Sequence, residues 1–181
     1  MTDPIGAGML DDSKDQWQMT FRRQLILAEQ KDVFDYWQAM RGDRRLPSRA
    51  DLNPAALKRH LPTILLLNVI DADRFSVRLA GTGIREVLDE EITGKFLSDI
   101  DFGEHNTYWQ AAHHRVVTEK RPAQGVAPVT WRNKGNLFVF WLRMPLSADG
   151  EQVDMILGYD VYLAAAKVDA LSKQQRMAQA G

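Results

Sequence analysis

The sequence predicts an α+β fold, namely a five-stranded antiparallel sheet with helices over one face and an added N-terminal helix. The first observation is the order of the strand-like segments, two before a helical middle and three after it: Thr63–Ile70 and Phe75–Gly81, then Gln124–Arg132, Leu137–Leu146 and Val153–Leu163. The second is that short polar turns, such as Ala148-Asp149-Gly150, separate neighbouring strands. Turns this short join antiparallel neighbours, whereas parallel strands need a long crossover.

Composition narrows the class of protein. The chain has 181 residues, a formal net charge of −1 and no cysteine. A near-neutral charge argues against a broad basic surface for nucleic acid, and the absence of cysteine excludes disulfides and thiolate chemistry. No apolar run approaches the length of a membrane span, and the N-terminus lacks a signal-peptide pattern. We therefore expect a cytoplasmic protein with no nucleic-acid partner and no membrane insertion.

One domain is expected over residues 21–163, between a loose N-terminal tail of residues 1–20 and a C-terminal tail of residues 164–181 that could extend as a solvated helix. The domain opens with a predicted helix, Phe21–Met40. Its apolar residues form a wide face, because three of them repeat every seven residues. This face predicts a homodimer interface made of Ile26, Val33, Phe34, Trp37 and Met40, with packing inside the same chain as the alternative.

Capping signals mark the shorter helices. Asn53 is followed by Pro54, which suits the first position of a helix, and Asp101 precedes Glu104 by three residues, as in a capping box. Residues Ile84–Asp89 form another short helical segment, and we expect Thr82 to cap it.

The strand Leu137–Leu146 carries apolar side chains on both faces. Such a strand is normally covered on both faces. One face should meet the helical middle, and the other needs the N-terminal helix or a second subunit. The cavity between the sheet and the helical middle is the default binding site, and its predicted lining is apolar: Phe75, Val77, Trp109, Phe140, Met155 and Leu157.

Several motifs resemble the PAS domain family. The segment from Arg78 to Ile84 (Arg-Leu-Ala-Gly-Thr-Gly-Ile), followed by Ile92-Thr93-Gly94-Lys95, resembles the second PAS strand and its following turn. Tyr36-Trp37, Arg41-Gly42 and the run from Leu46 to Pro54 resemble a stand-alone PAS-like family of bacteria, mainly alphaproteobacteria. The resemblance spans roughly residues 32–163. It implies a sensory or regulatory module that binds a small apolar or metabolite ligand, or a protein partner, and signals in trans.

The same resemblance suggests several possible cofactors, and the sequence excludes some of them. PAS domains that form a covalent adduct with flavin or a chromophore use a cysteine, and this chain has none. Noncovalent flavin has no specific support, and the cofactor stays unknown. Haem would need an axial histidine such as His105, His113 or His114, which we interpret instead as helix residues. No zinc-ligand spacing is present, so no metal site is predicted.

Two alternatives stay open beside the ligand sensor. One is a small cone-shaped enzyme of the isomerase kind, which would need a buried acid or a paired tyrosine and aspartate in its cavity. Tyr159 and Asp160 are neighbours on a strand and should point to opposite faces, so we expect no catalytic residues. The other is a ligand-free adaptor with a filled core.

Overall fold

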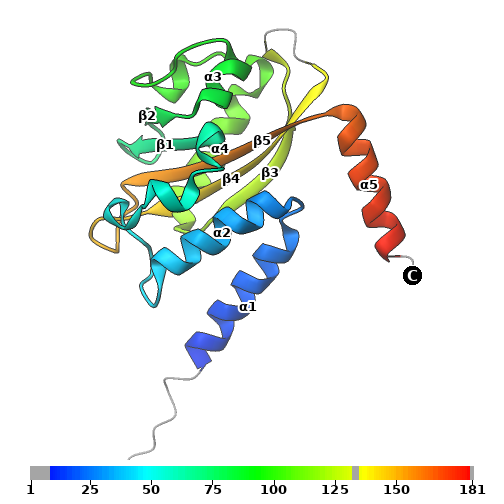
Figure 1. Ribbon diagram of the computed structural model, residues 1–181. Coiled ribbons are helices and arrows are strands. Elements are labelled where there is room, and N and C mark those ends of the chain that lie inside the picture. The colour runs from blue at the N-terminus through cyan, green and yellow to red at the C-terminus, as the bar shows by residue number, and fades with distance from the viewer. Residues whose placement is uncertain (1–8, 132–134, 180–181) are drawn as a thin grey trace, which may run out of the picture.

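A five-stranded antiparallel sheet in the order β2-β1-β5-β4-β3 organises the protein (Figure 1). The computed structural model describes residues 9–131 and 135–179. The strands are β1 Ile64–Val69, β2 Phe75–Ala80, β3 Ala123–Pro128, β4 Leu137–Leu146 and β5 Met155–Ala164. The predicted fold class is confirmed, and the observed bounds of β4 match the predicted ones.

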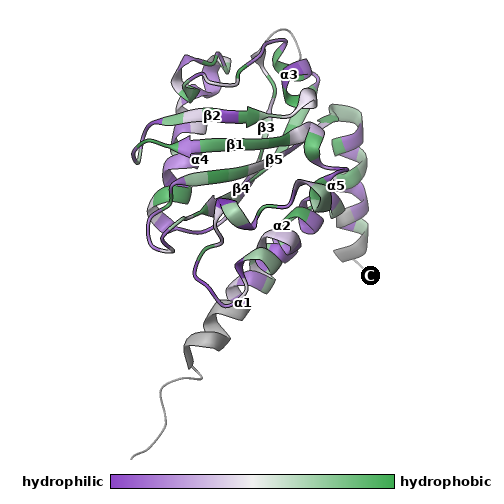
Figure 2. Cartoon of the chain, turned by 60° about the vertical axis from the view of Figure 1, so that its left-hand side comes forward, coloured by the Kyte–Doolittle hydropathy of each residue, from purple (hydrophilic) through white to green (hydrophobic). Residues whose placement is uncertain are grey.

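The central strands are covered on both faces. Helix α4, Asn106–Glu119, lies on one face, and helix α2, Ala28–Arg41, crosses the other (Figures 1 and 2). Figure 2 shows hydrophobic residues along β1, β5 and parts of α2. The second apolar face of β4 therefore lies under a helix of its own chain. We call the face toward α4 the inner face and the opposite one the outer face.

The N-terminal region differs from the prediction. The single predicted helix, Phe21–Met40, is two helices, α1 Met9–Gln24 and α2, separated at Leu25–Leu27. The break has a packing reason, because Leu25 and Leu27 both become buried there. Much of the predicted loose tail belongs to α1, and residues 1–8 lie outside the described residues.

Three further elements shift relative to their predicted bounds. Helix α4 begins at Asn106 rather than Asp101, because Gly103 has a left-handed φ of 61° and the Asp101 carboxylate accepts from its N–H in a turn. Strand β3 ends at Pro128, short of the predicted Arg132, which lies outside the described residues. The C-terminal segment forms helix α5, Ala165–Gln179, which stands away from the sheet in Figure 1.

Three short 3-10 helices, η1 Arg49–Asp51, η2 Pro54–Leu57 and η3 Leu61–Thr63, connect α2 to β1. The predicted cap at Asn53 is confirmed, since its side chain accepts from the N–H of Ala55 at 3.0 Å. The predicted cap at Thr82 is wrong. Helix α3, Thr82–Leu88, begins after Gly81 and has no side-chain cap.

Gly81 lies so close to the backbone of η3 that a larger residue does not fit. This gives a first testable prediction. A Cβ atom at this position would lie 2.3 Å from the carbonyl oxygens of Leu61 and Pro62. Gly81→Ala must therefore move η3 or α3, and we expect the free energy of unfolding to fall by about 1–3 kcal/mol. Urea unfolding measures this, with Gly135→Ala as the matched control because no atom lies within 4 Å of its Cβ. Equal stability of the two variants would contradict the close approach.

Candidate functional site

The inner face of the sheet carries a buried ion pair between Arg143 of β4 and Asp160 of β5. The Arg143 guanidinium donates to both carboxylate oxygens, at 2.6 and 3.2 Å, and both side chains are almost fully buried. Gly158 stands opposite Arg143 in the ladder, and its missing side chain leaves room for the guanidinium. A buried pair of this kind needs further hydrogen bonds to offset its desolvation.

Those further contacts come from aromatic residues and a histidine. The guanidinium carbon lies 5.5 Å from the ring centroid of Trp109 and 5.9 Å from that of Trp141. The Arg143 Nε donates to His113 Nε2 at 3.1 Å. Tyr162 Oη lies 3.5 Å from the Asp160 carboxylate. The inner face thus presents a polar cluster inside an apolar shell.

His113 is held neutral in one tautomer. Its Nδ1 lies 2.6 Å from the Trp109 carbonyl oxygen and must donate to it, so Nε2 is the acceptor for Arg143. Burial and the neighbouring Arg143 charge lower the pKa of His113 to about 3. At neutral pH the cluster therefore contains one cation and one anion.

This histidine makes stability depend on pH. Its folded pKa lies below the ordinary 6.5, so the unfolded state binds the proton first as pH falls. Stability is complete above about pH 6.5 and is lost as pH falls toward 3. Between pH 6.5 and 4.5 we expect a loss of about 2–3 kcal/mol. His113→Gln keeps an acceptor for Arg143 and should remove most of that slope in urea unfolding. A variant with the wild-type slope would contradict a neutral buried His113.

The void beside this cluster is small. It has a volume of about 30 Å³ and is lined by Trp109, Trp131, Arg143 and Asp160, among others. The indole N–H groups of Trp109 and Trp131 are buried and have no hydrogen-bond partner among the residues that the structure describes. A void of this size holds a water-sized molecule, whereas ligand sites commonly measure roughly 300–1,000 Å³. The residues present do not fit a flavin or a haem in this conformation.

Of the three histidines considered as axial ligands, His113 and His114 have engaged ring nitrogens, while His105 Nε2 is buried and has no partner among the described residues. Both ring nitrogens of His113 are engaged, and His114 Nδ1 faces Asp73 at 2.7 Å on the surface. Among the described residues no group of three potential metal ligands is found.

The predicted pocket residues are divided between the two faces. Phe75 and Trp109 both contact the His113 ring, and Val77 shares the inner face with Phe75. Alternation along β4 and β5 instead puts Phe140, Met155 and Leu157 on the outer face, opposite Arg143 and Asp160. The six residues therefore line no common cavity. Their ligand-binding role stays a prediction.

Arg143 and Asp160 were missed by the sequence reasoning. The available signal was one basic and one acidic residue, each alone within an otherwise buried apolar strand. A charge in such a place is seldom left unpaired. Pairing the two strands by their hydrophobic pattern would have brought them together.

Tyr159 lies on the outer face and Asp160 on the inner face, as strand alternation predicts. Tyr159 Oη lies 3.0 Å from His60 Nδ1, and burial raises the pKa of Tyr159 to about 12. Asp160 points to Arg143 on the inner face. The Tyr159–Asp160 pair therefore does not form. The buried acid that the isomerase alternative could use instead is Asp160 itself, which lies 3.5 Å from Tyr162 Oη and pairs with Arg143.

The predicted dimer-interface residues lie mostly in the protomer's own core. Val33 and Phe34 have 0% exposure and Trp37 has 2%, and the Trp37 Nε1 donates to the Pro145 carbonyl at 3.0 Å. A side chain that is buried within one protomer has no surface left for a second. Packing inside the same chain, the alternative stated above, accounts for these three, while Ile26 is exposed between the helices and Met40 is partly buried. The dimer interface itself stays a prediction.

None of the helices in the described parts of the chain is both long and apolar enough to cross a bilayer.

Comparisons with known proteins agree with this architecture. A family model described as a PAS domain matches residues 27–161. No curated protein matches the chain. A light-oxygen-voltage domain solved in a study of a flavin analogue is 12% identical, with a TM-score of 0.51, over 67% of this chain and 92% of that one. The Rhodobacter sphaeroides LOV protein is 18% identical, with a TM-score of 0.47, over 58% and 61%.

At these identities the solved structures share the fold alone. The family match shows more than a shared fold, because it runs from the start of α2 almost to the end of β5 and includes every strand of the sheet. Together with the 2-1-5-4-3 strand order and the helices over the inner face, it shows that this chain belongs to the PAS domain family.

Proposed function

We propose that this chain is a regulatory PAS module that acts in trans through protein contacts, without catalysis and without a cofactor in its inner cavity. The observation that carries the proposal is the filled inner face. Its void of about 30 Å³ is enclosed by tryptophans and by a buried ion pair, so a metabolite-sized ligand has no room. This favours the adaptor over the ligand sensor.

Native mass spectrometry and an absorption spectrum of freshly purified protein test this proposal. We expect the mass of the bare chain and no absorption in the visible range. A coloured protein, or a bound mass that survives gentle desolvation and is lost in Arg143→Met/Asp160→Leu, would show that the inner face opens for a ligand.

The structure also suggests where the output lies. Strand β5 ends at Ala164 and α5 begins at Ala165, so the strand that carries Asp160 continues into the helix without a loop. Helix α5 has few contacts with the other elements of the domain, chiefly with β4 and β5. We propose that α5 is the segment that a partner recognises.

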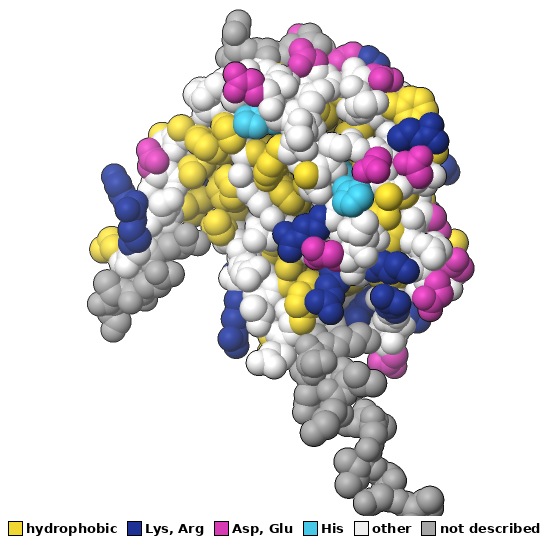
Figure 3. All heavy atoms as spheres, turned by 180° about the vertical axis from the view of Figure 1, so that it is seen from behind, with side chains coloured by type: hydrophobic (Ala, Val, Ile, Leu, Met, Phe, Trp, Pro, Cys, Tyr) yellow, Lys and Arg dark blue, Asp and Glu magenta, His cyan; other side chains and the backbone are white. Residues whose placement is uncertain are grey.

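A homodimer remains part of the proposal, on a different surface from the one predicted. Figure 3 shows hydrophobic side chains gathered between α5, at the left of the view, and the body of the domain. Phe138 and Leu163 pair on the outer face of the sheet and are partly exposed, and so are Val168 and Leu171 of α5. Exposed apolar side chains on both sides of the β5–α5 junction favour an interaction site there.

Light scattering tests whether the chain forms a homodimer through this surface. We expect the wild type to be a dimer and Val168→Glu/Leu171→Glu to be a folded monomer with an unchanged melting temperature. A wild-type monomer at tens of micromolar would remove the dimer from the proposal.

A second candidate function is a sensor for a very small ligand. The two indole N–H groups without partners at the void favour it, because buried donors normally find an acceptor. The mass measurement above separates the candidates, since only the sensor predicts added mass that is held at the inner face and lost in Arg143→Met/Asp160→Leu.

A further inference from the structure

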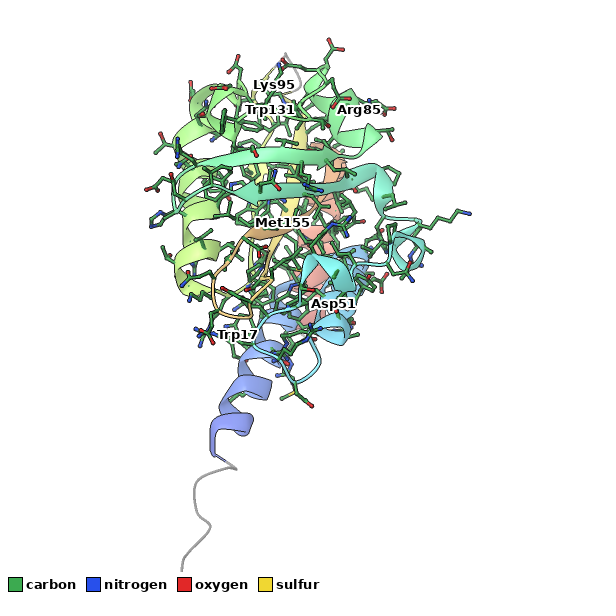
Figure 4. The ribbon with its side chains drawn as sticks, turned by 90° about the vertical axis from the view of Figure 1, so that its left-hand side faces the viewer. Trp17, Asp51, Arg85, Lys95, Trp131 and Met155 are labelled. Atoms are coloured by element: carbon green, nitrogen blue, oxygen red, sulfur yellow. The ribbon has the colours of Figure 1, made fainter. Side chains whose placement is uncertain are left out.

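A second cavity lies on the outer face, away from the inner cluster. It is a half-open groove of about 480 Å³ between the 3-10 segment and strands β1 and β2. Figure 4 labels Asp51 of η1 and Arg85 of α3, and these two segments lie beside the groove on the right-hand side of the view. Its volume falls within the range that holds drug-sized ligands.

The groove is lined mainly by hydrophobic side chains from both walls and from the strands beneath: Leu57, Leu61, Ile64, Leu66, Leu79 and Leu157. Leu79 is 44% exposed although it lies within a strand. The reason is a bulge. Leu66 pairs with Leu79 and Leu67 with Val77, so β2 contains one extra residue at this point. The bulge moves Leu79 from the inner face to the outer face and leaves it open to the groove.

Two cations, Arg49 and Lys58, belong to the lining, and the lining contains no acidic residue. Both are exposed, and neither forms an ion pair with any residue in the described ranges. The nearby acids are already used, because Asp51 pairs with Arg44 at 2.8 Å and Asp32 pairs with Arg59 at 2.6 Å. An anionic group beside the groove would therefore meet two free cations.

The lining does not suit a peptide. Its uncharged polar side chain is the hydroxyl of Thr82, so a peptide backbone would lose water without gaining hydrogen bonds. Strand addition at β2 is blocked as well. The edge of β2 that faces away from β1 is already hydrogen-bonded. The Val77 N–H donates to the Lys95 carbonyl at 2.8 Å, and the Val77 carbonyl accepts from the Gly94 N–H at 2.7 Å. An alkyl chain needs no such bonds.

We propose that this groove binds a free single-chain amphiphile with one anionic head, such as a fatty carboxylate. The alkyl chain lies over Leu61, Leu66 and Leu79, and the carboxylate lies between Arg49 and Lys58. Burial of the chain drives binding, and the two cations fix its direction and select the charged head over a neutral one. The site lies on the opposite face of the sheet from the inner cluster and is independent of the function proposed above.

Calorimetric titration of the full-length protein with dodecanoate, below its micellar concentration, tests the proposal. We expect saturable binding with one molecule per chain. Arg49→Gln/Lys58→Gln should weaken it at least about 10-fold, because the charge-assisted hydrogen bonds to the carboxylate are lost. Leu79→Glu should weaken it at least as much, since it places a carboxylate on the apolar floor. Methyl dodecanoate should bind the wild type at least about 10-fold more weakly than dodecanoate.

Two matched controls test whether the loss of dodecanoate affinity is specific to the groove residues. Arg23→Gln/Lys173→Gln removes two exposed cations elsewhere, and Ile70→Glu changes an apolar residue that is 49% exposed but outside the groove. All these positions are exposed, so melting temperatures should stay near the wild-type value, and both controls should bind dodecanoate normally. The proposal is overturned if the wild type shows no saturable binding, if the ester binds equally well, or if the controls lose as much affinity as the groove variants. Cosedimentation with anionic vesicles without binding of monomeric dodecanoate would overturn it too.

Discussion

Asp160→Ala is expected to lower the free energy of unfolding by about 3–5 kcal/mol, because it leaves the Arg143 charge buried without its partner. The carboxylate accepts two hydrogen bonds from the guanidinium, and water has little access to either side chain. A loss of this size is a large share of the roughly 5–15 kcal/mol that holds a domain together. Urea unfolding at neutral pH measures it.

Two comparisons separate the charge effect from simple loss of atoms. Arg143→Met/Asp160→Leu removes both charges and should be much more stable than Asp160→Ala alone, since apolar replacement of a buried pair is often neutral. Asp35→Ala breaks the exposed pair with Arg22 and should cost less than about 1 kcal/mol. If Asp160→Ala costs no more than Asp35→Ala, the ion pair is not enclosed as described.

Trp37→Ala should lower the free energy of unfolding by about 3–5 kcal/mol, while the oligomeric state of the remaining folded protein stays that of the wild type. The indole fills the core between α2 and the sheet, and its N–H donates to the Pro145 carbonyl. Its removal leaves a cavity and an unpaired carbonyl. Chemical unfolding gives the stability, and light scattering at the same concentration gives the mass.

Val33→Asp extends this test, since a carboxylate at a position with 0% exposure should prevent folding altogether. Met40→Ala is the milder control on the same helix, because Met40 is only partly buried. A stable, folded Trp37→Ala protein that changes from dimer to monomer would return this residue to a subunit interface.

The sheet could be predicted from the sequence because its signals are local. The alternation in β5 and the turn at Ala148-Asp149-Gly150 each depend on a few neighbouring residues. The break between α1 and α2 could not, because helical spacing continues through Leu25 and Leu27 and only their burial in the folded core decides the bend.

The faces of the strands could not be assigned for a similar reason. A shift of one residue exchanges the two faces of a strand, and local pattern does not choose between them where both are apolar. Phe140 and Leu157 were placed inward on that basis and lie outward. In β2 the regular alternation grouped Leu79 with Val77, and the bulge separates them. The charge cluster depends on the same long-range pairing, so neither candidate site was visible before the strands were aligned.

The direct passage from β5 to α5 has a geometrical consequence. Side chains on a strand reverse direction with each residue, over about 3.3 Å, whereas side chains on a helix advance by about 100° per residue. Strand β5 is held between β1 and β4 by long ladders, so its sliding is costly. If one residue at the junction were to change from helix to strand, the direction in which Val168 and Leu171 point would turn by about 100° around the helix axis. A small exchange of backbone hydrogen bonds at Ala164 and Ala165 thus corresponds to a large rotation of the apolar side of α5.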